Sequence, residues 1–256
     1  MNIKGILMAG GKGSRLRPLT SIINKHLLPI YNKPMIYYSL STLIYAGIKE
    51  ILIVCNDGDE KYFNKILKTI KARYKIKLFY SIQKNEGGGI AEGLNDNKDF
   101  IGGADKIAFI LGDNFFYGRL FTKLLNDLLM KKTNKSYVFL SEVSNPKNYG
   151  VAYLKNKKLI KIIEKPKNSK SNLAVTGLYL YNTNVLKVLS KIRPSKRNEL
   201  EITSVNNLLL RQKNLNYINI GRGTTWFDLG SYENIYNCSE FVQLLEKRQG
   251  LKICEL

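Results

Sequence analysis

Short apolar runs alternate with helical stretches through the first half of this 256-residue chain. The apolar runs have the length and the Ile, Leu and Val content of buried strands, and the stretches between them repeat apolar residues at helical spacing. Strands that alternate with helices favour a mainly parallel sheet covered on both faces. We therefore expect an α/β fold with a Rossmann-like, mostly parallel central sheet flanked by helices. The predicted strands are 4–8, 50–55, 77–81 and 106–111, and the predicted helices are 34–46 and 59–71.

The second half is less regular, but nothing in it marks a domain boundary. No Pro-, Gly- or Ser-rich linker, long repeat or low-complexity tract divides the chain. We expect one domain over 1–256, with a first part to about residue 140, an inserted lobe over about 141–230 and a C-terminal helix over 231–256. In this half the predicted strands are 137–142, 150–153, 158–164 and 175–181, and the predicted helices are 202–211 and 231–248.

The chain is strongly basic, with 41 Lys and Arg against 20 Asp and Glu and a net charge of +21. Such a charge attracts phosphates, so nucleic-acid binding is one interpretation. The lysines, however, are spread from Lys4 to Lys252 instead of forming a tail or one helix face. This distribution favours a Lys-rich enzyme with anionic substrates and no nucleic-acid partner.

Histidine and cysteine content excludes several kinds of chemistry. His26 is the only histidine, which argues against Ser-His-Asp and Cys-His catalysis and against an imidazole zinc site. The three cysteines, Cys55, Cys238 and Cys254, form no CxxC pair and no even disulfide framework. No apolar run resembles a signal peptide or approaches a membrane span. We expect a cytoplasmic protein whose chemistry rests on carboxylates, lysines, arginines and a hard metal ion.

A glycine-rich loop over 8–18 follows the first predicted strand. In open α/β folds ligands bind beyond the carboxyl ends of the strands, and glycines let backbone N–H groups approach a phosphate chain. Lys12, Arg15 and Arg17 add cations suited to phosphate. The loop lacks the GK[ST] of a Walker A motif, and Leu16 stands where a Rossmann fingerprint has its third glycine.

The full string from Leu7 to Pro18, L-x-A-G-G-x-G-x-R-L-x-P, resembles the signature loop of sugar-1-phosphate nucleotidyltransferases. Further segments resemble motifs of this family in the same order, and together they are most similar to the glucose-1-phosphate thymidylyltransferases. These segments are 24–36 (NKHLLPIYNKPMI), 111–114 (LGDN), 149–151 (YGV), 164–166 (EKP), 175–179 (VTGLY), 199–203 (ELEIT) and 226–230 (WFDLG).

The resemblance implies transfer of a nucleotidyl group from a nucleoside triphosphate, dTTP being favoured, to a sugar 1-phosphate, α-D-glucose 1-phosphate being favoured. The products would be dTDP-glucose and pyrophosphate, which would serve deoxysugar and cell-surface polysaccharide synthesis. The first part of the chain would bind the nucleotide and the inserted lobe the sugar phosphate. The resemblance also implies a homo-oligomer, either a dimer or a tetramer.

The resemblance assigns catalytic roles to three cations and metal binding to two carboxylates. Arg15 would stabilise the triphosphate and the leaving pyrophosphate, Lys25 would contact phosphates near the attacked phosphorus, and Lys165 would hold the sugar 1-phosphate. Asp113 and Asp228 each stand in a turn after an apolar run. Two carboxylates, with phosphate oxygens and waters, suit Mg²⁺, which takes few protein ligands.

The binding residues implied by the resemblance fall into two groups, and His26 stands apart from both. His26 occupies a position that the family often gives to Gln, where it would touch phosphate or cap local structure without being catalytic. The expected nucleotide-binding residues are Leu7, Ala9, Gly10, Gly11, Gly13, Gln83, Gly88 and Gly89, and the expected sugar-phosphate-binding residues are Gly150, Glu164, Lys165 and Val175.

The segment 81–92 departs from the family pattern for recognition of the base. Gln83 offers both a donor and an acceptor to a pyrimidine edge. Three successive glycines and an apparent extra residue leave either Gly88 or Gly89 as the backbone that faces the base, and Glu92 replaces the usual Gln. UTP, CTP or another hexose 1-phosphate therefore remain alternatives, as does, more weakly, an inactive nucleotide-binding or nucleic-acid-binding protein.

The chain ends at Leu256, whereas long members of the family continue with further helices. In those members the additional helices help to build a regulatory site and subunit contacts. We therefore expect weak or no feedback inhibition by a deoxysugar nucleotide at a non-catalytic site.

Overall fold

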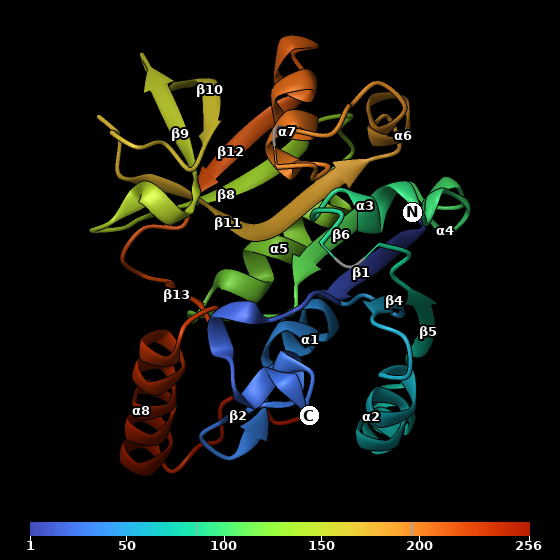
Figure 1. Ribbon diagram of the computed structural model, residues 1–256, viewed down its shortest axis with the longest axis vertical. Coiled ribbons are helices and arrows are strands. Elements are labelled where there is room, and N and C mark those ends of the chain that lie inside the picture. Colours follow the sequence, from blue (N-terminus) through green and yellow to red (C-terminus); the bar gives the residue numbers. More distant parts are fainter. Residues whose placement is uncertain (86, 196) are drawn as a thin grey trace.

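The computed structural model describes residues 1–85, 87–195 and 197–256 (Figure 1). Within these residues a nine-stranded sheet forms the centre of the molecule. Its strands are β1 (Ile3–Ala9), β4 (Glu50–Cys55), β5 (Lys77–Ile82), β6 (Lys106–Leu111), β8 (Ser136–Glu142), β9 (Gly150–Lys155), β10 (Lys158–Glu164), β11 (Leu173–Asn182) and β12 (Leu215–Asn219).

The central sheet joins a parallel half to a largely antiparallel half. Along the main path the strand order is β10-β9-β11-β6-β1-β4-β5, and β8 lies between β11 and β12. β1 pairs parallel with β4 and β6, and β4 pairs parallel with β5. β11 runs antiparallel to β6, β8 and β9, whereas β12 is parallel to β8. The expected α/β fold with a central sheet flanked by helices is confirmed.

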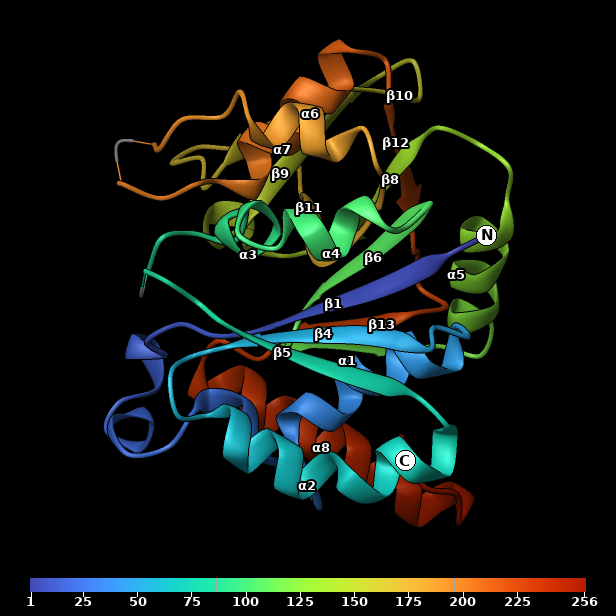
Figure 2. The ribbon, with the colours of Figure 1, turned by 90° about the vertical axis from the view of Figure 1, so that its right-hand side faces the viewer.

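Apolar side chains on both faces of the sheet explain why its parallel strands read as continuous hydrophobic runs. In β1, Leu7 and Ala9 pack on one face with α1 (Met35–Tyr45), α2 (Glu60–Tyr74) and α5 (Phe121–Met130). Ile6 and Met8 face the opposite core. In Figure 2 a separate layer of helices covers this face of the sheet. That layer consists of α3 (Glu92–Asn95), α4 (Lys98–Gly102), α6 (Val185–Leu189) and α7 (Ile202–Arg211).

The order of the strands creates a crevice at the carboxyl end of β1. The chain proceeds from β1 to β4 and β5 on one side and then returns to β6 on the other side. Loops that leave neighbouring strands in opposite directions open a crevice at such a switch point, and ligands of open α/β sheets bind there. The glycine-rich loop after β1 and Asp113 after β6 both lie at this edge.

After β12 the chain returns to the strand that follows β6. β13 (Thr225–Asp228) pairs antiparallel with β7 (Asn114–Tyr117), and α8 (Tyr232–Gln249) follows. The Ser231 hydroxyl caps α8 by accepting a hydrogen bond from Asn234 N, and Gly250 ends it in the left-handed conformation. A small third apolar cluster joins α8 to β7 through Phe115, Cys238 and Val242.

The predicted elements recur with shifts of a few residues at their ends, except that the C-terminal helix expected over 231–256 ends at Gln249, where Gly250 adopts the left-handed conformation. Several short elements were not predicted. The unpredicted elements are β2 (Pro29–Ile30), β3 (Lys33–Pro34), β7, β12, β13 and α3 to α6. In the part of the chain that the structure describes, no helix is both long and apolar enough to cross a membrane.

Candidate active site

The glycine-rich loop is fixed from two directions as it leaves β1. Asn24 Nδ2 donates to the Ala9 carbonyl (2.8 Å), and Gly11 N donates to Asn56 Oδ1 (2.8 Å). Gly11 and Gly13 have positive φ values of 105° and 57°, in the region that favours glycine. The loop therefore keeps a defined shape beside the crevice.

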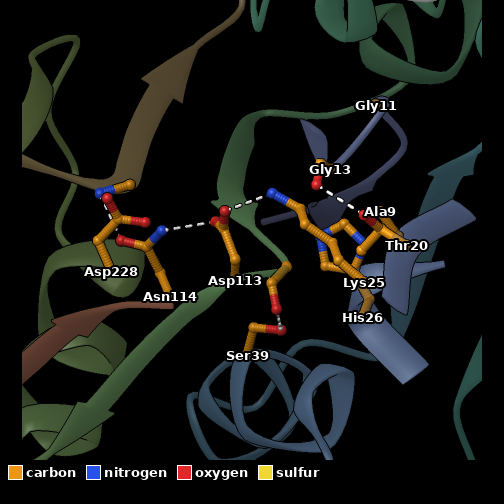
Figure 3. A network of polar contacts seen from close by, with 12 residues as sticks. Ala9, Gly11, Gly13, Thr20, Lys25, His26, Ser39, Asp113, Asn114 and Asp228 are labelled. Carbon is orange, nitrogen blue, oxygen red and sulfur yellow. Dashed lines mark hydrogen bonds and ion pairs between the residues drawn. The ribbon is translucent and has the colours of Figure 1, made fainter. Parts of the chain in front are cut away.

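Asp113 lies at the centre of a polar network at the end of β6 (Figure 3). Lys25 Nζ donates to Asp113 Oδ2 at 2.5 Å, and Asn114 Nδ2 donates to Asp113 Oδ1 at 3.0 Å. Burial opposes ionisation, but the adjacent Lys25 and His26 and these hydrogen bonds hold the pKa of Asp113 well below its usual value. Asp113 is therefore ionised and held in one orientation.

Lys25 and His26 lie on a single helical turn that Asn24 caps. Asn24 Oδ1 accepts from His26 N (2.9 Å) and from His26 Nδ1 (2.8 Å). Burial, with the charge of Lys25, lowers the pKa of His26 to about 3, so the ring is neutral near pH 7. Asn24, and not His26, caps this turn, and His26 also lines the cavity. Both alternatives for His26, a phosphate contact and a local structural role, stay predictions.

Asp228 is brought beside Asp113 by the pairing of β13 with β7. Asp228 is in register with Asn114, and Leu229 N donates to the Asp113 carbonyl at 2.8 Å. Burial and the charge of Asp113 raise the pKa of Asp228 to about 6. The structure thus places two carboxylates close enough to repel each other, and a bound cation would relieve this repulsion.

Arg15 lies over Gly230, directly beyond this pair. A Cβ at position 230 would overlap the Arg15 guanidinium, so the final glycine of the 226–230 motif makes room for the arginine. The charge of Arg15 acts on Asp228 and lowers its pKa, against the larger effects that raise it. Arg15 therefore lies within electrostatic reach of the carboxylates.

Gly10, Asp113 and Glu164 line one cavity. The part of this cavity around Glu164 is formed by β9, β10 and the start of α7. Glu164 Oε2 accepts from the Thr203 hydroxyl at 2.5 Å, and Gly150 pairs with Glu164 across the two strands. A Cβ at Gly150 would lie 3.1 Å from Thr203 Oγ1 and 3.4 Å from Glu164 Oε2. A glycine at 150 therefore keeps this carboxylate open to the cavity.

Arg197 stands among carboxylates on the same side. Its guanidinium donates to Glu201 (2.8 Å) and Glu199 (2.9 Å), and Glu164 Oε1 lies 3.7 Å from Nη2. The sequence interpretation did not assign Arg197. The sequence signal that could have indicated Arg197 is its position, two residues before the ELEIT segment.

The segment 81–92, predicted to recognise the base and called the base loop below, contacts the ELEIT segment 199–203 through backbone hydrogen bonds. Leu200 N donates to the Gly88 carbonyl (2.7 Å), and Ala91 N donates to the Leu200 carbonyl (3.0 Å). Gly89 has φ of 97°, and a Cβ there would lie 2.5 Å from Leu200 O. Residue 86 of this predicted loop lies outside the described residues.

One cavity contains most of the predicted site residues. Leu7, Ala9, Gly13 and Gly88 do not line it: the side chains of Leu7 and Ala9 are in the core, and Gly13 packs against Thr20. Asn114, Tyr149 and Trp226 line it within motifs quoted above but had no predicted role. The predicted residues that line the cavity are Gly10, Gly11, Arg15, Lys25, Gln83, Gly89, Asp113, Gly150, Glu164, Lys165, Val175 and Asp228.

A profile described as nucleotidyl transferase matches residues 4–244 of the chain. The chain belongs to the nucleotidyl transferase family. This confirms the resemblance on which the site was predicted.

Individual nucleotidyl transferases are similar over nearly the whole chain. A glucose-1-phosphate thymidylyltransferase of Mycolicibacterium smegmatis is 40% identical over 253 residues, which cover 98% of this chain and 86% of the relative. A solved Bacillus anthracis structure in complex with sucrose, assigned to the same enzyme, has a TM-score of 0.84 and 36% identity, covering 93% and 94% of the two chains. A UDP-glucose pyrophosphorylase complexed with UDP-glucose has a TM-score of 0.82 and 26% identity, covering 95% and 99%.

Gly177 offers a test of the network around Asp113. Gly177 N donates to Asn114 Oδ1 (2.8 Å), and a Cβ at position 177 would lie 2.6 Å from the Asn114 amide. We expect Gly177→Ala to displace Asn114 and to lower kcat/KM in a pyrophosphate-release assay about 10- to 100-fold, because misplacement near 1 Å costs about that much. Gly102→Ala is the control, since nothing lies within 4 Å of its Cβ. Unchanged activity of Gly177→Ala would show that Asn114 does not position Asp113.

Proposed function

We propose that this chain transfers a thymidylyl group from dTTP to α-D-glucose 1-phosphate, with release of pyrophosphate. The observation that carries the proposal is one cavity lined both by Gly10 and Gln83, which follow β1 and β5, and by Glu164, at the end of β10 across the sheet. The carboxylates of Asp113 and Asp228 line the same cavity. This arrangement offers separate places for a nucleotide and a sugar phosphate.

The donor set of the cavity fits Mg²⁺. Among the residues that the structure describes, no group of three His, Cys, Asp or Glu side chains could hold a metal ion. Asp113 and Asp228 supply carboxylate oxygens only, and Mg²⁺ typically takes one or two carboxylates together with substrate phosphates and waters. We infer that these two residues hold Mg²⁺, which would neutralise charge on the triphosphate.

The remaining cations provide positioning and charge neutralisation, which phosphoryl-type transfer needs more than covalent help. A phosphate oxygen of the sugar 1-phosphate attacks the α-phosphorus, a new P–O bond forms, and the bond to the β-phosphate oxygen breaks. Arg15 stabilises the leaving pyrophosphate and Lys25 orients the phosphates beside Asp113. Lys165 holds the sugar 1-phosphate, and Arg197 fixes the carboxylates of Glu199 and Glu201 with which it is paired.

The sugar lies beside Gly150, Glu164 and Val175 in this proposal, with Glu164 accepting from sugar hydroxyls. The thymidylyltransferase assignments of the relatives support dTTP and glucose 1-phosphate. UTP is the second candidate, supported by the UDP-glucose pyrophosphorylase of similar fold. The two bases differ by a methyl group whose burial contributes only about 1 kcal/mol.

Pyrophosphate release over a grid of nucleoside triphosphates and sugar 1-phosphates tests the proposed substrates. We expect the highest kcat/KM for dTTP with glucose 1-phosphate. A higher value with UTP would replace the nucleotide, and no turnover with any pair would refute the proposed activity.

Removal of divalent metal is expected to abolish turnover. EDTA should lower the rate to background, and excess Mg²⁺ should restore it, because the triphosphate charge beside Asp113 and Asp228 would otherwise be uncompensated. Full activity after exhaustive chelation would contradict the metal assignment.

The cytoplasmic location, the homo-oligomer and the weak feedback inhibition stay predictions.

A further inference from the structure

Glu92 is a buried carboxylate at the end of the base loop, and the proposed reaction gives it no role. It is 4% exposed, at the start of α3. Glu92 Oε2 accepts from Gln83 Nε2 at 3.1 Å, and Glu92 Oε1 accepts from Asn85 Nδ2 at 2.5 Å. Both carboxylate oxygens therefore accept from side-chain amides.

These contacts fix which way the Gln83 amide points. Gln83 Nε2 also donates to the Asn85 carbonyl at 3.1 Å. Turning the amide over would place its oxygen against two acceptors, Glu92 Oε2 and Asn85 O, and would lose both hydrogen bonds. A carboxylate cannot donate, so Glu92 permits one orientation only.

The fixed orientation leaves the Gln83 oxygen without a partner. Gln83 Oε1 is buried, and no donor among the described residues reaches it. It lies against Gly10, where a Cβ would overlap it, and both residues line the cavity. A buried acceptor without a hydrogen bond costs about 1–3 kcal/mol, so a ligand that donates to it gains affinity.

We propose that Glu92 is a specificity-determining positioning residue, which holds Gln83 Oε1 toward the cavity so that it accepts the ring N3–H of a thymine or uracil base. Cytosine has a bare acceptor nitrogen at that position, which would face the oxygen unfavourably. Gly88 is part of the same arrangement, because a Cβ at this position would overlap the Glu92 carboxylate. The proposal deepens the proposed function and rests on it for the identity of the bound nucleotide.

The isosteric variant Glu92→Gln tests this arrangement. Its amide can accept from Gln83 Nε2 or donate to Gln83 Oε1, so a turned Gln83 amide gains one hydrogen bond and then faces one acceptor, the Asn85 carbonyl, instead of two. We expect the dTTP:dCTP ratio of kcat/KM to fall about tenfold, which corresponds to one hydrogen bond of about 1.4 kcal/mol, and kcat with dTTP to change less than about threefold. Equal losses with both nucleotides, or an unchanged ratio, would overturn the proposal.

A double-mutant cycle separates this role from a structural one. In a Gln83→Ala background, Glu92→Gln should leave the dTTP:dCTP ratio unchanged, because Glu92 would act only through Gln83. A tenfold fall that persists in this background would contradict the proposal.

Calorimetric binding of dTMP and dCMP keeps the inference testable if no substrate pair is turned over. The wild-type chain should bind dTMP more tightly than dCMP, and Glu92→Gln should narrow that difference about tenfold. A wild-type preference for dCMP, or a dTMP preference that Glu92→Gln leaves intact, would contradict the role of Glu92.

Discussion

Asp113→Asn should lower kcat at least about 1,000-fold while the protein stays folded. The wild-type carboxylate accepts from both Lys25 and Asn114, and with Asp228 it forms the proposed metal site. An amide at position 113 carries no charge and turns a donor toward one of those donors. The loss combines weaker metal binding with a displaced Lys25, and a metal or an electrostatic contact at the reacting centre each contribute several kcal/mol. Steady-state pyrophosphate release at saturating substrates measures it.

Asp127→Asn provides the matched control for this change. Asp127 is an exposed carboxylate on α5 that does not line the cavity, so kcat should stay within about twofold of wild type. Circular dichroism should show similar melting temperatures for both variants. If Asp113→Asn kept full Mg²⁺-dependent activity, Asp113 would not be a metal ligand.

Arg15→Ala should lower kcat/KM about 100- to 1,000-fold, by analogy with the loss of one preorganised donor to a developing negative charge. The guanidinium lies over Gly230 and acts on Asp228. In the proposed reaction, this is where the charge of the leaving pyrophosphate develops. Because the contact strengthens as the leaving group separates, most of the loss should appear in kcat and not in KM. Initial rates over a range of dTTP concentrations separate the two.

Arg17→Ala removes the same charge from the same loop and serves as the control. Arg17 is exposed and does not line the cavity. We expect less than about a threefold change in kcat/KM. Comparable losses in both variants would show that the overall positive charge of the loop, and not the position of Arg15, is what matters.

The strands of the parallel half were predictable because their residues are apolar on both faces. The strands 50–55 and 106–111 match their predicted bounds, since each is an apolar run that begins at a charged residue. In the antiparallel half, 158–164 also matches its predicted bounds. By contrast, β7 and β13 were not predicted. Each has four residues, and each is a strand only because the other lies beside it.

The site residues were placed mainly by motif, and their partners required the structure. Asp113 and Asp228 are 115 positions apart. The resemblance assigned both to one metal site, and the structure shows that the pairing of β7 with β13 brings them together. Likewise, the hydrogen bond between Gln83 and Glu92, nine positions apart in a glycine-rich loop, was not predicted. For Leu7 and Ala9, the motif predicted nucleotide contacts. Their side chains face the core instead, because alternate residues of a strand point to opposite faces of the sheet.

Phosphorus NMR of one reaction tests the central claim most directly. Wild-type enzyme, dTTP, glucose 1-phosphate and Mg²⁺ should give pyrophosphate and a sugar nucleotide in equal amounts, because breaking the bond to the β-phosphate accompanies formation of the new bond at the α-phosphorus. No inorganic phosphate should appear. Accumulation of a nucleoside diphosphate with inorganic phosphate, or no loss of dTTP, would contradict nucleotidyl transfer by this cavity.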